Sequence, residues 1–263
     1  IQSPTVMTRI TAMMMGEATG ELETIRAGDA AFLNSGLPKN ISDESIEEAI
    51  EFSRSMDSHA LLIYHNDEII LEKYFNDYNA ETISDTQSMH KTVLAMMIGI
   101  AIDEGIIESV NESASKYLTE WKDDSRKLIT IKHLLQQSSG LDYPEFSFHP
   151  LSEFNQLMLG EDVTKMTLLQ TAYRKPNELF EYNGVNPQNL GLLLQRAYGK
   201  RYADLLSEKL WQKIAQDDAS VVLDSKENKM PRTYCCLNAT ARDWLRIGII
   251  MLNEGQFKEK QIV

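Results

Sequence analysis

One tetrad in the chain, Ser88-Met89-His90-Lys91, places a hydroxyl and an amine three residues apart at the start of a predicted helix. Residues at this spacing lie on one face of a helix, so the Lys91 amine can lie beside the Ser88 hydroxyl. The helix N-terminus offers free N–H groups and a positive dipole end, which favour a developing alkoxide and oxyanion. An apolar surrounding would disfavour the charged ammonium, so a neutral amine could accept the serine proton. The tetrad predicts acyl transfer.

The same spacing occurs a second time, in Ser113-Ala114-Ser115-Lys116, within a polar connection. Spacing alone therefore does not identify a catalytic pair. The alternative for Ser88 is an ordinary helix N-cap, with a solvated Lys91 beside it. Spacing and helix placement leave both interpretations open.

The elements that must position the tetrad are mostly helices. The residues at 93–103 are apolar nearly all round, which predicts a central buried helix ending at Gly105. Upstream, 41–56 predicts a surface helix capped by Ser42 or Asp43, and 60–64 with 69–74 predict a β-hairpin. Further helices are expected near 129–135, 153–159, 164–173, 188–197, 202–214 and 240–253.

This order of elements predicts an α+β fold, with an antiparallel sheet flanked by helices and a mostly helical second region. Residues 1–40 show no sustained period and predict an extended N-terminal arm, which leaves 41–263 as the main domain. A length of 263 residues fits one large domain or two closely packed ones.

Composition excludes several functional classes. The formal charge of −13 repels phosphate backbones and anionic surfaces, so nucleic acid is not expected as a partner. The sequence has no run of about 18 apolar residues, so no transmembrane helix is expected. The histidines show no metal-ligand spacing, and neither a metal nor another cofactor is predicted. Cys235 and Cys236 are the only cysteines, and neighbours in sequence rarely pair, so no disulfide is expected.

Several separated segments resemble serine β-lactamase-like hydrolases, in the class C and esterase branch. Beyond the tetrad, the similar segments stand in the family's order. They are 98–107, 129–135, Ser138-Ser139-Gly140-Leu141, 180–184, 190–194 and 235–248, the last being similar to 6-aminohexanoate-dimer hydrolases and related esterases.

The resemblance implies roles for individual residues. Ser88 would be the nucleophile, Lys91 its activator, and Tyr182 the proton shuttle toward the leaving group. A phenol has an ordinary pKa of about 10, and a neighbouring ammonium can poise it for proton exchange. The family's Y-x-N motif would put an amide where this chain has Gly184, so Asn183 and Asn186 are the expected substitutes in substrate binding.

A third family motif, K-T-G or H-x-G, has no equivalent after Tyr182. In the family its strand lies beside the nucleophile and supplies a backbone N–H to the oxyanion hole. The hairpin alone is also expected to be too small to cover the apolar helix at 93–103. We therefore expect the C-terminal strands of the sheet to be missing here, and the fold to be completed by a further C-terminal segment or a second chain.

The sequence thus predicts a serine hydrolase that forms an acyl-enzyme on Ser88 and acts on small esters or amides. β-Lactamase or D-alanyl peptidase (penicillin-binding) activity would use the same three residues. A non-catalytic scaffold or binding protein is the alternative from another class, favoured by the absent third motif. The resembled family also implies a bacterial periplasmic or secreted protein.

Overall fold

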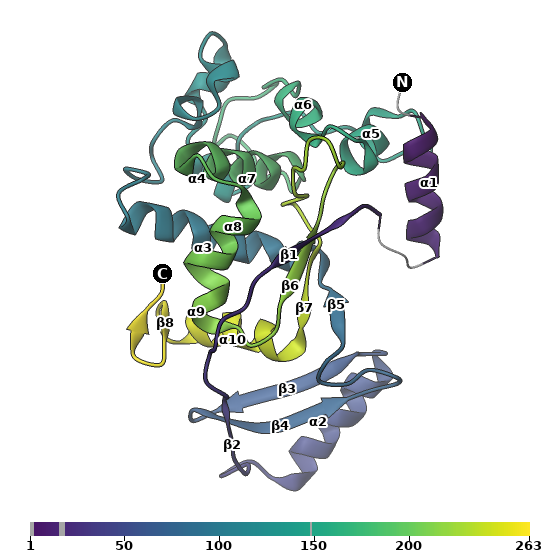
Figure 1. Cartoon of the computed structure of the whole chain (residues 1–263), viewed down its shortest axis with the longest axis vertical. Helices are drawn as coiled ribbons and strands as arrows, with labels where there is room; N and C mark the ends of the chain where they lie inside the picture. The colour runs from purple at the N-terminus through teal and green to yellow at the C-terminus, as the bar shows by residue number, and fades with distance from the viewer. Residues whose placement is uncertain (1–2, 16–18, 148) are drawn as a thin grey trace.

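The computed structural model describes residues 3–15, 19–147 and 149–263. Figure 1 shows a small sheet with one helix at one end of the molecule and a larger, mostly helical part at the other, joined near β5. The mixed architecture, with antiparallel sheet and many helices, confirms the predicted α+β class.

The small sheet contains the predicted hairpin. β3 (Ala60–His65) and β4 (Glu68–Tyr74) pair antiparallel, and β2 (Asn34–Ser35) joins β4 in parallel. α2 (Asp43–Ser55) accompanies this sheet, and the Ser42 side chain caps it by accepting from the Ser45 amide. The order β2-β4-β3 leaves β3 at an edge that no other strand of the described residues covers.

A second sheet lies beside the helical part and was not predicted. Its order is β1-β6-β7-β5, with every neighbouring pair antiparallel. The strands are β1 (Leu22–Ile25), β6 (Ala219–Val222), β7 (Leu237–Thr240) and β5 (Ile83–Asp85). The expected N-terminal arm is therefore wrong as a description of this region: it forms α1 (Ser3–Met14), which packs against α5, then β1 and β2.

The apolar helix is α3 (His90–Asp103), preceded by the 3₁₀ turn η1 (Gln87–Met89). It packs against α7 (Val185–Tyr198) and the π-helical turn η5 (Ser207–Trp211). Helices therefore bury much of its surface, so its burial does not depend on the hairpin, which was expected to be too small to cover it. Val93, Leu94 and Met97 are fully buried in the main hydrophobic core.

The other predicted helices are present, with boundaries shifted by a few residues. Thr130 begins α4 through a capping box with His133. The remaining elements are α4 (Ile131–Leu135), α5 (Glu153–Leu159), α6 (Val163–Leu168), α8 (Tyr202–Leu206), α9 (Gln212–Ile214), α10 (Ala241–Leu252), β8 (Gln256–Phe257), β9 (Lys260–Gln261), and the 3₁₀ turns η2 (Ala114–Lys116), η3 (Thr119–Trp121) and η4 (Ser125–Leu128). Across the described ranges, no helix is both long enough and apolar enough to span a bilayer.

Candidate active site

Ser88 lies in η1, between the end of β5 and the first turn of α3. The preceding residue, Gln87, has a left-handed backbone with φ of 50°. This conformation is uncommon for a residue with a side chain, and Asp85 stabilises it. The Asp85 carboxylate accepts from the Gln87 amide and from its side-chain Nε2, each at 2.9 Å. The tight turn presents Ser88 at the surface, directly before a buried helix.

The Lys91 amine lies beside the serine hydroxyl. Lys91 Nζ is 2.9 Å from Ser88 Oγ and also donates to the carbonyl oxygen of Tyr234. Met89, not Ser88, is the residue that precedes α3, and no side chain caps this helix. The alternative of an ordinary capping serine with a solvated lysine is therefore wrong. Among the residues described, no carboxylate forms an ion pair with Lys91.

Tyr182 completes the group from the loop that leads into α7. Lys91 Nζ lies 5.0 Å from the centroid of the Tyr182 ring, and Tyr182 is 57% exposed. Partial burial alone would raise the pKa of Tyr182, but hydrogen bonding to Ser88 and Lys91, together with the Lys91 charge, lowers it below its ordinary value. The structure thus brings together Ser88, Lys91 and Tyr182.

Asn183 and Asn186 do not line this group as expected. Both are buried, at 2% and 0% exposure. Asn186 Nδ2 donates to Gln137 Oε1 at 2.9 Å, and its Oδ1 accepts from the Ser139 hydroxyl at 2.5 Å. Asn183 Oδ1 accepts from the Asn186 amide at 3.0 Å. These amides hold the Tyr182 loop to the 137–139 turn, so their assignment to substrate binding is corrected to a supporting role.

Gly184 is buried at the beginning of α7. A Cβ atom there would lie 3.5 Å from the Tyr234 side chain and 3.6 Å from the Tyr143 hydroxyl. Aromatic side chains therefore occupy the space beside the position where the family motif carries an amide. As placed, Gly184 can offer only backbone groups to a substrate.

His90 lies inside the tetrad and is fully buried in the first turn of α3. Its Nδ1 donates to the Cys235 carbonyl at 2.7 Å, and its Nε2 accepts from the Tyr202 hydroxyl at 2.8 Å. Burial lowers the pKa of His90 to about 4, and the nearby Lys91 charge acts in the same direction. The neutral ring connects α3 to residues 235 and 202.

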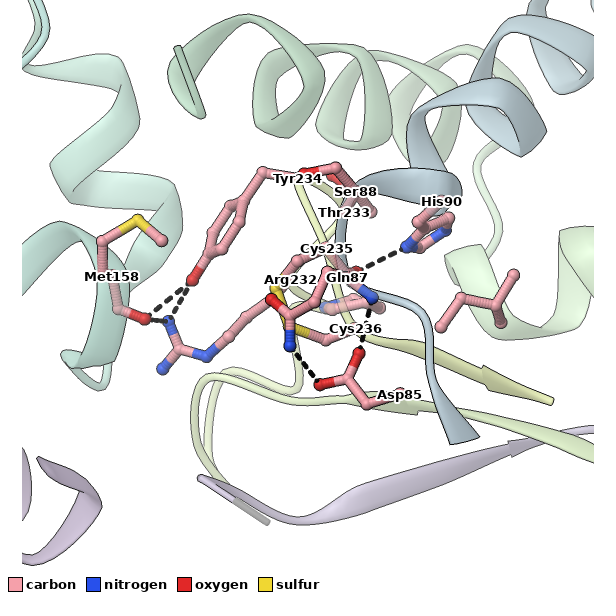
Figure 2. The surroundings of a disulfide bond; sticks show 12 residues. Asp85, Gln87, Ser88, His90, Met158, Arg232, Thr233, Tyr234, Cys235 and Cys236 are labelled. Carbon is pink, nitrogen blue, oxygen red and sulfur yellow. Dashed lines mark hydrogen bonds between the residues drawn. A yellow bond between two sulfur atoms is a disulfide. The ribbon is translucent and has the colours of Figure 1, made fainter. Parts of the chain in front are cut away.

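Cys235 and Cys236 form a disulfide, contrary to the expectation for neighbouring cysteines. Figure 2 shows the pair between Arg232 and the Gln87–His90 turn. The Cys236 amide donates to the Gln87 carbonyl at 3.3 Å. Sequence reasoning missed this contact and the Tyr234 carbonyl beside Lys91, because backbone groups leave no residue-type signal.

Comparisons with known proteins identify the family of the chain. The beta-lactamase family matches residues 43–261. The 6-aminohexanoate-dimer hydrolase of Paenarthrobacter ureafaciens is 25% identical over 207 residues, covering 74% of this chain and 52% of that protein. The flp protein of Staphylococcus aureus is 26% identical over 191 residues, covering 67% of this chain and 38% of that protein. The chain therefore spans about half or less of the length of these relatives.

Solved structures show the same fold. A Bacillus anthracis structure assigned as a 6-aminohexanoate-dimer hydrolase has a TM-score of 0.79 at 23% identity, covering 97% of this chain and 71% of that one. FmtA from Staphylococcus aureus has a TM-score of 0.58 at 16% identity, covering 86% and 70%. These structures show the shared fold. The family match over residues 43–261 confirms the resemblance inferred from the motifs and shows that the chain belongs to the beta-lactamase family.

Proposed function

We propose that the protein is a serine hydrolase that forms an acyl-enzyme on Ser88. The observation that carries this proposal is the 2.9 Å contact between Lys91 Nζ and Ser88 Oγ, with the Tyr182 ring centroid 5.0 Å from Lys91 Nζ. A nucleophile within hydrogen-bond reach of a base, and a third group that orients and exchanges the proton, is the arrangement required for covalent catalysis.

In the proposed acylation, Lys91 accepts the Ser88 proton while Oγ attacks the substrate carbonyl carbon. The carbonyl electrons move to oxygen, where the Ser88 amide and the positive end of α3 stabilise the charge. Tyr182 passes a proton to the leaving group as its bond to the carbonyl carbon breaks. Water then attacks the ester on Ser88 and gives a proton to the Tyr182 phenolate, and the proton held by Lys91 returns to Ser88 Oγ as the ester bond breaks.

Small esters or amides are the proposed substrates. The relative from Paenarthrobacter ureafaciens is named for hydrolysis of a 6-aminohexanoate dimer, which is an amide. Gly184 offers no side chain to a β-lactam amide, and Tyr143 and Tyr234 fill the adjoining space. These observations favour esterase or amidase activity over β-lactamase or D-alanyl peptidase activity.

We also propose that a further strand of polypeptide completes the oxyanion site from the edge of β3. This edge has no partner strand among the described residues, and an apolar cavity of about 570 Å³ lies beside it. The cavity is lined by Leu62 on β3, Trp244 on α10 and Met89, the residue that follows the nucleophile. A strand here would bring backbone N–H groups toward Ser88.

The test is intact-mass spectrometry after incubation with a fluorophosphonate, followed by peptide mapping. A single adduct on Ser88, absent from Ser88→Ala, is the expected result. The labelled protein would then be assayed on nitrophenyl esters, a 6-aminohexanoate dimer and a chromogenic cephalosporin to rank the substrate classes. A folded protein that shows no adduct would refute acyl-enzyme formation and favour the non-catalytic scaffold.

A further inference from the structure

Three consecutive residues, Tyr234, Cys235 and Cys236, contact the segment that carries the nucleophile. The Tyr234 carbonyl accepts from Lys91 Nζ, and the Cys235 carbonyl accepts from His90 Nδ1 at 2.7 Å. The Cys236 amide donates to the carbonyl of Gln87 at 3.3 Å. We call residues 234–236 the contact strip. Its three backbone contacts reach the residue before Ser88 and the two residues that begin α3.

Residues on the N-terminal side of the contact strip fix it to other helices. The Thr233 amide donates to Gln188 Oε1 at 3.0 Å, and the Thr233 hydroxyl donates to the Pro187 carbonyl at 3.0 Å. The buried Arg232 donates from Nη2 to the Gly160 carbonyl at 2.7 Å. On the other side, residue 237 enters β7, which pairs with β5 just before Ser88. The strip therefore has anchored neighbours on both sides.

The backbone of the contact strip has an unusual conformation. Cys236 has φ of 68°, in the left-handed region that residues with a Cβ atom rarely adopt. Such a conformation persists when the surrounding structure determines it. The covalent link from Cys236 to Cys235 joins two adjacent side chains, so it restricts the backbone between them. Each cysteine is only 8% exposed, which places the link inside the protein.

We propose that the Cys235–Cys236 disulfide is a positioning element of the active site: it fixes the contact strip, and through it the Ser88–Lys91 pair. Covalent catalysis depends on the placement of the base beside the nucleophile, and a displacement of about 1 Å can reduce a rate by about 10²-fold. Opening the bond would remove the covalent restraint on the backbone at 235–236, so the Tyr234 carbonyl would be held less tightly against Lys91. This inference rests on the proposed function of Ser88.

The first experiment opens the bond with dithiothreitol under native conditions. The S–S bond breaks, two cysteine thiols form, and the dithiol is oxidised to its cyclic disulfide, so atoms and electrons balance. Alkylation by iodoacetamide followed by intact-mass measurement counts the thiols. The kinetics of fluorophosphonate labelling of Ser88, resolved into reagent binding and the bond-forming step, report on the site. We expect a slower bond-forming step, by about tenfold or more, with little change in reagent binding.

Two double variants provide the matched comparison. Cys235→Ala with Cys236→Ala removes the bond and leaves a residue with a Cβ at the left-handed position. Cys235→Ala with Cys236→Gly removes the same bond, but glycine adopts this conformation without steric cost. We expect the alanine pair to slow labelling more than the glycine pair does, because glycine restores part of the backbone geometry. Melting temperatures measured in parallel ensure that labelling is compared among folded proteins.

The outcomes separate this inference from the proposed function. If the oxidised wild-type protein shows no adduct on Ser88, the proposed function fails. If Ser88 is labelled at the same rate in the wild-type protein and in both double variants, the bond has no positioning role. Two alkylatable thiols in untreated protein purified under oxidising conditions would also overturn the inference. If dithiothreitol does not reduce the bond, the labelling rates of the two double variants test the inference.

Discussion

The two S-x-x-K segments of this chain have the same spacing but different surroundings. Lys91 Nζ lies 2.9 Å from Ser88 Oγ and contacts a backbone carbonyl. In the other copy, Ser113 caps η2 and donates to the Lys127 carbonyl at 2.8 Å, and Lys116 forms an ion pair with a carboxylate instead. The shared spacing permits a serine–lysine contact, and the other partners of each lysine and serine determine whether this contact forms.

The two lysines also differ in the pKa of the tyrosine that lies beside each of them. Lys116 lies 5.5 Å from the Tyr117 ring centroid, and Lys91 lies 5.0 Å from that of Tyr182. Burial and the hydrogen bond to Glu112 raise the pKa of Tyr117, whereas the pKa of Tyr182 is lowered. The hydrogen bond to Glu112 also raises the pKa of Lys116. The lysine of the second copy therefore has a carboxylate partner, whereas no carboxylate among the described residues forms an ion pair with Lys91.

The largest expected difference concerns the two serines. Ser88→Ala removes the nucleophile and should lower turnover by about 10⁴-fold or more, as expected for loss of a covalent catalyst. Ser113→Ala should leave turnover unchanged and cost about 1 kcal/mol in the free energy of unfolding, because it removes a cap. Turnover of the best ester substrate and urea denaturation measure the two effects. Equal turnover in the two variants would contradict the assignment.

Replacement of each lysine by arginine tests the role of the base. A guanidinium keeps its proton in proteins, so Lys91→Arg preserves the charge but cannot accept the serine proton. We expect a loss of about 10³-fold in kcat for Lys91→Arg, within the range for general-base catalysis. Lys116→Arg should be neutral, because arginine can still pair with Glu112. Wild-type-like turnover in Lys91→Arg would show that Lys91 acts only by its charge.

Replacement of the tyrosine beside each lysine should have the next largest effect on activity. Tyr182→Phe should lower kcat/KM by about 10²-fold, because it removes a proton-transfer group. Since the pKa of Tyr182 is lowered and the proposed mechanism needs its proton, its ionisation should produce a fall in wild-type kcat/KM that begins below pH 10, and this fall should vanish in Tyr182→Phe. Tyr117→Phe is the control and should keep the wild-type pH profile. A profile that survives in Tyr182→Phe would assign the ionisation to another group.

The smallest expected effect is on stability, and it compares the buried His90 of α3 with His133 of α4. The folded pKa of His90 is about 4, below the unfolded value, so the unfolded state binds the proton first as the pH falls. Stability is therefore lost between about pH 6.5 and pH 4, by roughly 2 kcal/mol from pH 7 to pH 5. His90→Gln should remove most of this dependence, and His133→Gln should retain most of it. Chemical denaturation at the two pH values measures the difference, and a wild-type protein equally stable at both would refute it.

Local signals predicted most helices and the hairpin. The caps at Ser42 and Thr130, and the apolar residues at 93–103, act within a few residues, so the sequence reports them directly. The short strands β1, β5, β6 and β7 were missed because each has at most four residues and pairs with a distant part of the chain. Their formation depends on tertiary contacts that no local pattern encodes.

The candidate site was predicted in part. Spacing indicated Ser88 and Lys91, and the family resemblance added Tyr182. The supporting roles of Asn183 and Asn186 were missed, because sequence does not tell whether a polar side chain at a loop faces inward or outward. The disulfide was missed for a different reason: neighbouring cysteines rarely pair, and nothing in the sequence indicates the left-handed backbone of Cys236.

The pairing of β1 with β6, and of β5 with β7, has a consequence for the order in which the molecule is built. A ribosome releases Ser88 and Lys91 well before residues 219–240, which the four-stranded sheet requires. Pairings so distant in sequence form slowly, after local helices. A nascent chain would therefore contain a helical α3 with no organised active site. During refolding, helical signal should return before activity, and the interval between them measures how long the last strands take to close the sheet.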